Sequence, residues 1–199
     1  MLMMADEAQL VLVDYQTRLM PAIQDSSAVL GNAVRLAQLA QWFRVPIWTT
    51  EQAPDKLGET CQELRPMIGR VLHKTRFSAA DVLEPCLQPP RSVPQGNARS
   101  LPRHLQKPVA PEARRAQLVL AGCEAHVCLL QTALELLDQD WEVFVVTDAC
   151  GSRTERNRDA AFDRLAGAGA ELVTTEMVAF EWVESADHSA FKAVSALVK

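Results

Sequence analysis

Six short apolar segments, mostly separated by amphipathic helical segments, constrain the fold of this chain more than any other feature. Each has six to eight residues, and its length and β-branched content are typical of a buried strand. We expect strands at residues 8–14, 45–50, 69–74, 117–122, 142–149 and 170–175.

Apolar residues recur at helical spacing between most of these strands and after the last one. We expect helices at residues 29–43, 127–138, 157–169, 176–183 and 188–199. Ser26 or Ser27 is the predicted N-cap of the first helix. Strands that alternate with helices form parallel βαβ units, and nearly continuous apolar strands fit a sheet covered on both faces. The predicted fold class is therefore α/β, a three-layer, doubly wound, Rossmann-like fold.

Length and charge limit the class of protein. The chain has 199 residues, the size of one ordinary domain, and we expect a single domain over residues 1–199. Its net charge of −5 gives no strong field for nucleic acid or for an anionic membrane, so neither is an expected partner. No apolar run approaches the roughly 20 residues of a membrane helix, and no signal-peptide pattern is visible. We therefore expect a cytoplasmic protein.

Cysteine usage and glycine motifs give no sign of a cofactor. The chain has five cysteines, an odd number that argues against a disulfide framework. None forms a CxxC pair, and no Cys/His cluster has zinc-finger spacing. The glycine patterns of dinucleotide-binding and P-loop proteins are also missing. We predict no cofactor.

Residues 88–114 differ in composition from the rest of the chain. They contain six of the eleven prolines, more basic than acidic side chains, and little apolar periodicity. A flexible surface loop is the first interpretation. An arm that binds phosphate or a partner is the alternative.

Three side chains of different chemistry are expected at one edge of the sheet. Ligands of an open parallel sheet bind beyond the carboxyl ends of its strands. Asp14 ends the first predicted strand, Lys74 ends the third, and Cys128 lies near the first turn of the helix after the fourth. Gln16, Gln52 and Phe77 at the same edge are predicted substrate contacts.

This combination of groups suits a cysteine nucleophile. A thiol is mostly protonated at neutral pH, and it reacts faster when its thiolate is stabilised. The helix start and Lys74 are expected to stabilise a thiolate at Cys128. Asp14 could accept the thiol proton and pass it to a leaving group.

Several segments resemble the isochorismatase-like cysteine hydrolases. Residues 121–153, from AGCEAHVC to TDACGSR, are similar to the cysteine signature of that family. VLVDYQ at 11–16 resembles its aspartate motif, and HKTRFSA at 73–79 resembles its lysine motif. TEQAP at 50–54 and DHSAFKAVSALVK at 187–199 resemble the branch of isochorismatase domain-containing proteins.

The resemblance implies a six-stranded parallel sheet and assigns roles at its edge. Cys128 is implied as the nucleophile, Asp14 as general base and acid, and Lys74 as the cation that supports both. The backbone N–H groups of Glu124 and Cys128 are implied as an oxyanion hole. The family often has a cis peptide at the equivalent of Cys123–Glu124.

Other assignments stay open. Cys123 lies closer to the strand end than Cys128 and is a second candidate nucleophile, although the helical run after Cys128 matches the family better. A Cys–His dyad with His126 is a further alternative, but residues two apart on a helical turn do not face each other. An activated Cys128 would also suit a redox-sensing protein.

The expected activity is hydrolysis of a small molecule, with cleavage of a C–N amide bond through a thioester-type intermediate. The region after the second strand, TEQAPDKLGE, has no histidine, so we predict no metal. A homo-oligomer is implied by the resemblance. The alternative function is a catalytically silent binding or scaffold protein that has kept the fold.

Overall fold

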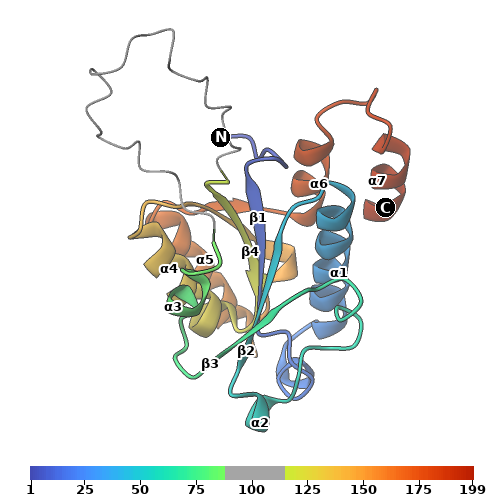
Figure 1. Ribbon diagram of the computed structural model, residues 1–199. Coiled ribbons are helices and arrows are strands. Elements are labelled where there is room, and N and C mark those ends of the chain that lie inside the picture. Colours follow the sequence, from blue (N-terminus) through green and yellow to red (C-terminus); the bar gives the residue numbers. More distant parts are fainter. Residues whose placement is uncertain (88–114) are drawn as a thin grey trace, which may run out of the picture.

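A computed structural model describes residues 1–87 and 115–199 of the chain (Figure 1). These residues form an all-parallel sheet of six strands in the order β3-β2-β1-β4-β5-β6. The strands are β1 (Ala8–Val13), β2 (Ile47–Gln52), β3 (Val71–Lys74), β4 (Gln117–Gly122), β5 (Glu142–Val146) and β6 (Glu171–Val173). The predicted fold class is confirmed. The loop predicted at 88–114 lies outside the described residues.

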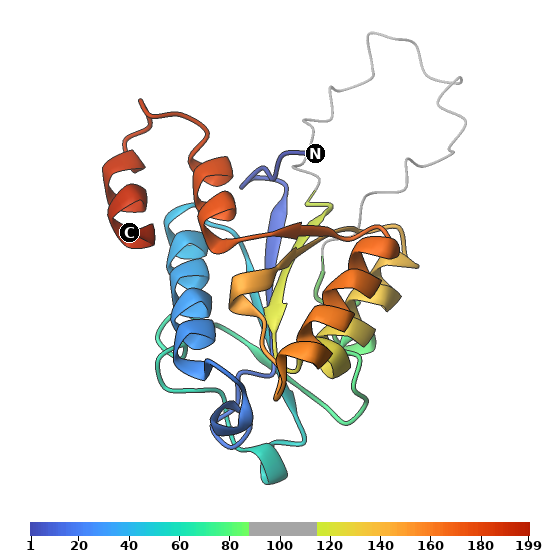
Figure 2. The ribbon, with the colours of Figure 1, turned by 180° about the vertical axis from the view of Figure 1, so that it is seen from behind.

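Helices cover both faces of the sheet. They are α1 (Ser26–Trp42), α2 (Pro54–Leu57), α3 (Ala80–Leu83), α4 (Leu130–Leu137), α5 (Glu155–Gly167), α6 (Thr175–Val183) and α7 (Phe191–Val198). α1, α6 and α7 lie on one face, and α3, α4 and α5 lie on the other, as Figures 1 and 2 show from opposite sides. Every residue of β1 and β4, the two central strands, is buried between these layers.

The central strands approach each other closely at their carboxyl ends. Val13, the last residue of β1, pairs in register with Gly122, the last residue of β4. A Cβ atom on Gly122 would lie 2.4 Å from the backbone oxygen of Val13, so a side chain at this position would collide with β1. The strands therefore deliver the segments that follow them to one small region.

Several predicted boundaries differ from the structure by a few residues. The first helix begins at Ser26, and its N-cap is Asp25, which makes no side-chain cap bond, so the serine cap was wrong. The fifth strand ends at Val146 rather than at residue 149, and Thr147–Ala149 form a 3₁₀ turn. This turn brings the Asp148 carboxylate to the start of α6, where it accepts a hydrogen bond from the Thr175 amide at 2.8 Å.

The helix after β4 starts differently from the prediction as well. A π-helical turn, Ala125–Leu129, leads into α4. Cys128 therefore belongs to an irregular turn rather than to the body of a helix. Of the helices in the described ranges, none combines the length and the apolar character needed to cross a bilayer.

Candidate active site

The carboxyl ends of β1 and β3 hold a buried ion pair. Asp14 follows β1 directly in a left-handed backbone conformation, with φ of 54°. Lys74 is the last residue of β3, and its Nζ lies 2.6 Å from Asp14 Oδ2. The Asp14 side chain is 0% exposed and the Lys74 side chain is 1% exposed. A buried charge is very costly without a partner, so each group compensates the other.

A hydroxyl donor, a side-chain amide and a backbone carbonyl complete the surroundings of this pair. Thr50 on β2 donates its hydroxyl proton to Asp14 Oδ1 at 2.7 Å. Lys74 Nζ also donates to Gln52 Oε1 and to the Phe77 carbonyl, both at 2.9 Å. An ammonium has three protons, and Asp14, Gln52 and Phe77 supply three short acceptors. The position of the ammonium is therefore fixed from three sides.

Cys128 is brought to the same place by the π-helical turn. It is 6% exposed, and its thiol lies close enough to Asp14 and Lys74 for both charges to shift its pKa. Burial raises the pKa of this thiol to about 12, and the Asp14 charge adds to the rise, while the Lys74 ammonium acts in the opposite direction. The structure thus unites the three side chains predicted from sequence. The sequence predicted a stabilised thiolate at Cys128. In the structure, burial and the Asp14 charge raise the pKa of the thiol by more than the Lys74 ammonium lowers it.

The predicted substrate contacts are placed around this centre. Gln16 is buried; its Nε2 donates to the backbone oxygens of Gln52 and Gly58, and its Oε1 accepts from the Gln52 amide. Gln52 donates its own side-chain amide to the Thr75 carbonyl at 2.8 Å. Phe77 has 53% of its surface exposed beside Lys74. Gln16 and Gln52 hold the backbone, and the substrate contacts of all three residues stay predictions.

The segment between β4 and α4 carries the implied oxyanion groups. The peptide bond between Cys123 and Glu124 is cis. The Glu124 carboxylate accepts hydrogen bonds from the backbone N–H and the Nε of Arg153, at 3.1 and 3.0 Å. Cys123 is fully buried, and burial raises its pKa well above the ordinary value. His126 Nδ1 lies 3.0 Å from Ser152 Oγ.

Sequence reasoning assigned no role in the site to Thr50 or Arg153. Thr50 could have been suspected, because it ends a predicted strand at the same edge as Asp14. Arg153 had no comparable signal, since its contact with Glu124 depends on how two distant loops meet. In the described ranges, no group of three or more His, Cys, Asp or Glu side chains is arranged to hold a metal ion.

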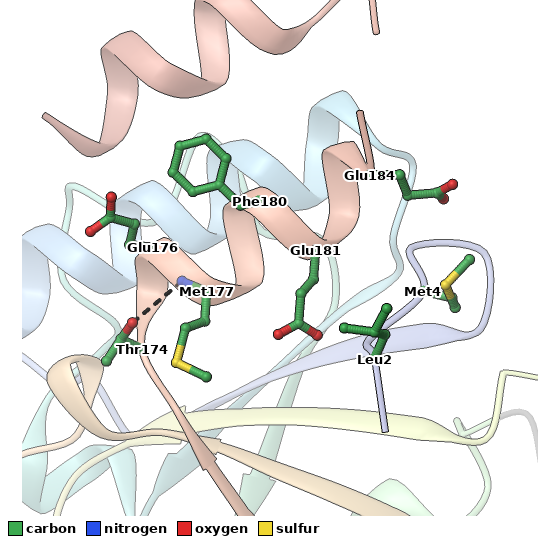
Figure 3. Close-up of a pocket in the computed structure, with 8 residues that line it drawn as sticks. All are labelled: Leu2, Met4, Thr174, Glu176, Met177, Phe180, Glu181 and Glu184. Carbon is green, nitrogen blue, oxygen red and sulfur yellow. Dashed lines mark hydrogen bonds between the residues drawn. The ribbon is translucent and has the colours of Figure 1, made fainter. Parts of the chain in front are cut away.

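A cavity of about 660 Å³ lies elsewhere, between the N-terminal segment and α6 (Figure 3). Apolar side chains and carboxylates line it, but Asp14, Lys74 and Cys128 do not. Its lining residues are Leu2, Met4, Thr174, Glu176, Met177, Phe180, Glu181 and Glu184.

The parallel doubly wound sheet, with an Asp–Lys pair and a cysteine at its carboxyl edge, is the architecture of the isochorismatase-like hydrolase class. The Isochorismatase domain model matches residues 8–177, so the chain belongs to the isochorismatase family. Human isochorismatase domain-containing protein 2 is 35% identical over 190 residues, which cover 96% of this chain and 82% of that protein. Mouse isochorismatase domain-containing protein 2A is 32% identical over 190 residues, which again cover 96% of this chain and 82% of that protein.

Solved structures have the same fold. A MAR1 ribonuclease from Caenorhabditis elegans superposes with a TM-score of 0.83 and 28% identity, over all of this chain and 92% of that one. The YcaC gene product of Escherichia coli, described as an octameric hydrolase of unknown specificity, superposes with a TM-score of 0.79 and 23% identity. That match covers 98% of this chain and 90% of the other. Family membership supports a hydrolase role for this chain.

Proposed function

We propose that the protein is a cysteine-dependent hydrolase that cleaves the C–N bond of a small amide. The observation that carries this proposal is the buried Asp14–Lys74 pair beside the Cys128 thiol, whose pKa both charges shift. A charged pair beside a protonated thiol suits general base catalysis, in which the proton leaves the sulfur as the sulfur attacks.

The first half of the reaction forms a thioester. Cys128 Sγ attacks the amide carbon while its proton moves to the Asp14 carboxylate. The backbone N–H groups of Glu124 and Cys128 hold the oxyanion of the tetrahedral intermediate. The C–N bond then breaks, and Asp14 returns the proton to the departing amine. Lys74 keeps its charge throughout and orients Asp14.

The second half releases the acid. Water attacks the thioester carbon and gives a proton to Asp14. The C–S bond breaks, and the sulfur leaves as the thiol after it receives that proton. Asp14 thus accepts and donates a proton in each half, and no further group is needed to balance the reaction.

A panel of small amides tests this mechanism in the wild-type protein, Cys128→Ala and Cys86→Ala. Loss of the nucleophile should lower the turnover of any accepted amide by at least about 10³-fold. The Cys86 thiol contacts the Val82 carbonyl of α3 and not the Asp14–Lys74 pair, so its substitution should leave turnover unchanged. Equal turnover in wild type and Cys128→Ala would contradict the proposal.

A single-stranded RNA belongs in the same panel, because one structural relative is named a ribonuclease. Our proposal expects no RNA cleavage by any of the three proteins. RNA cleavage that disappears in Cys128→Ala would replace the amide with a phosphodiester as the substrate.

We also propose that the protein works as a homo-oligomer. Exposed large apolar side chains, among them Trp42 and Phe180, support an interface between copies, as does the octamer named for YcaC. Light scattering coupled to size-exclusion chromatography tests this. A monomer at micromolar concentration would contradict it.

A further inference from the structure

The loop between β3 and α3, residues 75–79, fixes the Lys74 ammonium through its backbone. Phe77 supplies a carbonyl at 2.9 Å from Lys74 Nζ, and Arg76 supplies a second one at 3.4 Å. β3 is an edge strand, so the sheet restrains this loop from one side only. Other contacts must therefore hold the carbonyls in place.

Glu135 on α4 binds the loop on both sides of Phe77. Its Oε1 lies 2.9 Å from Arg76 Nη2, and its Oε2 accepts the Ser78 hydroxyl proton at 2.7 Å. Ser78 Oγ in turn accepts a hydrogen bond from the Ala80 amide. One carboxylate thus holds both residues that flank the carbonyl bound to Lys74.

Thr132, one turn earlier on α4, connects the loop to the nucleophile. It is fully buried, and its Oγ1 accepts a hydrogen bond from the Ala79 amide at 2.9 Å. The same hydroxyl donates to the Cys128 carbonyl at 2.6 Å. The hydroxyl therefore links the backbone of the lysine loop to the backbone of the cysteine.

We propose that Thr132 and Glu135 are positioning residues: they fix the 75–79 loop on the helix that follows Cys128, and thereby hold the Lys74 ammonium at the thiol. This inference rests on the proposed function, because it assigns the ammonium a role in activating Cys128. It adds two residues that act on the backbone around Lys74 and Cys128 and not on the reacting atoms. The backbone of Cys128 and the loop carbonyls that bind Lys74 are then held by the same helix.

Alkylation of the full-length protein by iodoacetamide tests the inference. The rate at Cys128 is followed by mass mapping at pH 9 in wild type, Thr132→Val, Thr132→Ser, Glu135→Ala and Lys74→Met. Thr132→Val keeps the shape of the side chain and removes both hydrogen bonds, whereas Thr132→Ser keeps the hydroxyl. Gln131→Ala, an exposed neighbour on α4, is the matched control.

The direction of the change separates positioning from simple loosening. A displaced ammonium stabilises the thiolate less, so alkylation should slow by about 3- to 30-fold in Thr132→Val and Glu135→Ala. Thr132→Ser and Gln131→Ala should match wild type. Loosening of a packed helix would instead expose the buried sulfur and accelerate its alkylation. That acceleration would overturn the inference.

Lys74→Met distinguishes failure of this inference from failure of the proposed function. Slow alkylation in Lys74→Met, combined with wild-type rates in Thr132→Val and Glu135→Ala, would overturn the positioning role alone. A Cys128 alkylation rate that is unchanged in Lys74→Met would contradict the placement of the thiol beside the Asp14–Lys74 pair, on which the proposed function rests, and would overturn that function as well. If Lys74→Met does not fold, the direction of the change in the other variants still decides the positioning role.

Discussion

The carboxyl edge of the sheet and the cavity beside α6 both combine polar and apolar side chains, but they bury charge differently. At the edge, Asp14 and Lys74 are fully enclosed and each has several hydrogen-bond partners. In the cavity, Glu176 and Glu184 are exposed, and the Glu181 carboxylate accepts the Met3 amide at 2.7 Å. Figure 3 shows these carboxylates among apolar side chains.

This difference indicates where chemistry is expected. An exposed carboxylate costs little to keep, so its presence says little about function. A buried ion pair is retained at the expense of desolvation, and apolar residues of the same volume would often be at least as stable. We therefore infer function from the enclosed pair beside a thiol, and not from the volume of the cavity.

Asp14→Asn should give the largest effect. Without the proposed general base, turnover of an accepted amide should fall by about 10²- to 10⁴-fold. The Asp14 charge raises the pKa of Cys128, so this pKa should fall in Asp14→Asn and alkylation at pH 8 should become faster. Measuring both rates on the same variant checks that turnover falls while alkylation of Cys128 becomes faster.

Asp25→Asn is the matched control, because Asp25 also has a left-handed conformation but is exposed. It should change neither rate. Slower alkylation in Asp14→Asn would mean that Asp14 does not raise the pKa of the thiol, and it would weaken the contrast between the two regions.

Lys74→Met should lower the free energy of unfolding by about 3–5 kcal/mol, because it leaves the Asp14 carboxylate buried without its cation. Chemical denaturation monitored by circular dichroism measures this. Lys56→Met, on the exposed helix α2, should change stability by less than about 0.5 kcal/mol. Equal stabilities of the two variants would show that the pair is not buried in solution.

The sequence was sufficient for the main features of the edge. Asp14 and Lys74 each end an apolar strand and Cys128 follows one, and parallel strands bring such positions together. The raised pKa of Cys128 could not be read from the sequence, because it depends on burial by distant segments. The contacts of Thr132 and Glu135 depend on the approach of α3 to α4, which no local pattern encodes.

Alkaline pH should destabilise the carboxyl edge through its thiols. Burial raises the pKa of Cys150 from 9.0 to about 12. The protonated thiol therefore stabilises the fold fully below pH 9, and this contribution is lost as the pH rises toward 12. The loss at pH 10 should be on the order of 1 kcal/mol for this one group.

Denaturation of wild type and Cys150→Ala at pH 8 and pH 10 isolates this contribution. The stability difference between the two proteins should change by that amount, because alanine does not titrate. An unchanged difference would mean that the thiol ionises equally in the folded and unfolded chains.

Met177→Gln, in the cavity beside α6, should give the smallest effect. Met177 is 44% exposed, so a polar side chain of similar length should change stability by less than about 0.5 kcal/mol. Turnover of an accepted amide should stay at the wild-type value, because the cavity shares no lining residue with the Asp14–Lys74 pair. Steady-state kinetics of this variant beside Asp14→Asn measures the contrast directly. A tenfold loss of turnover in Met177→Gln would place the cavity within the working site, and buried charge would no longer distinguish the two regions.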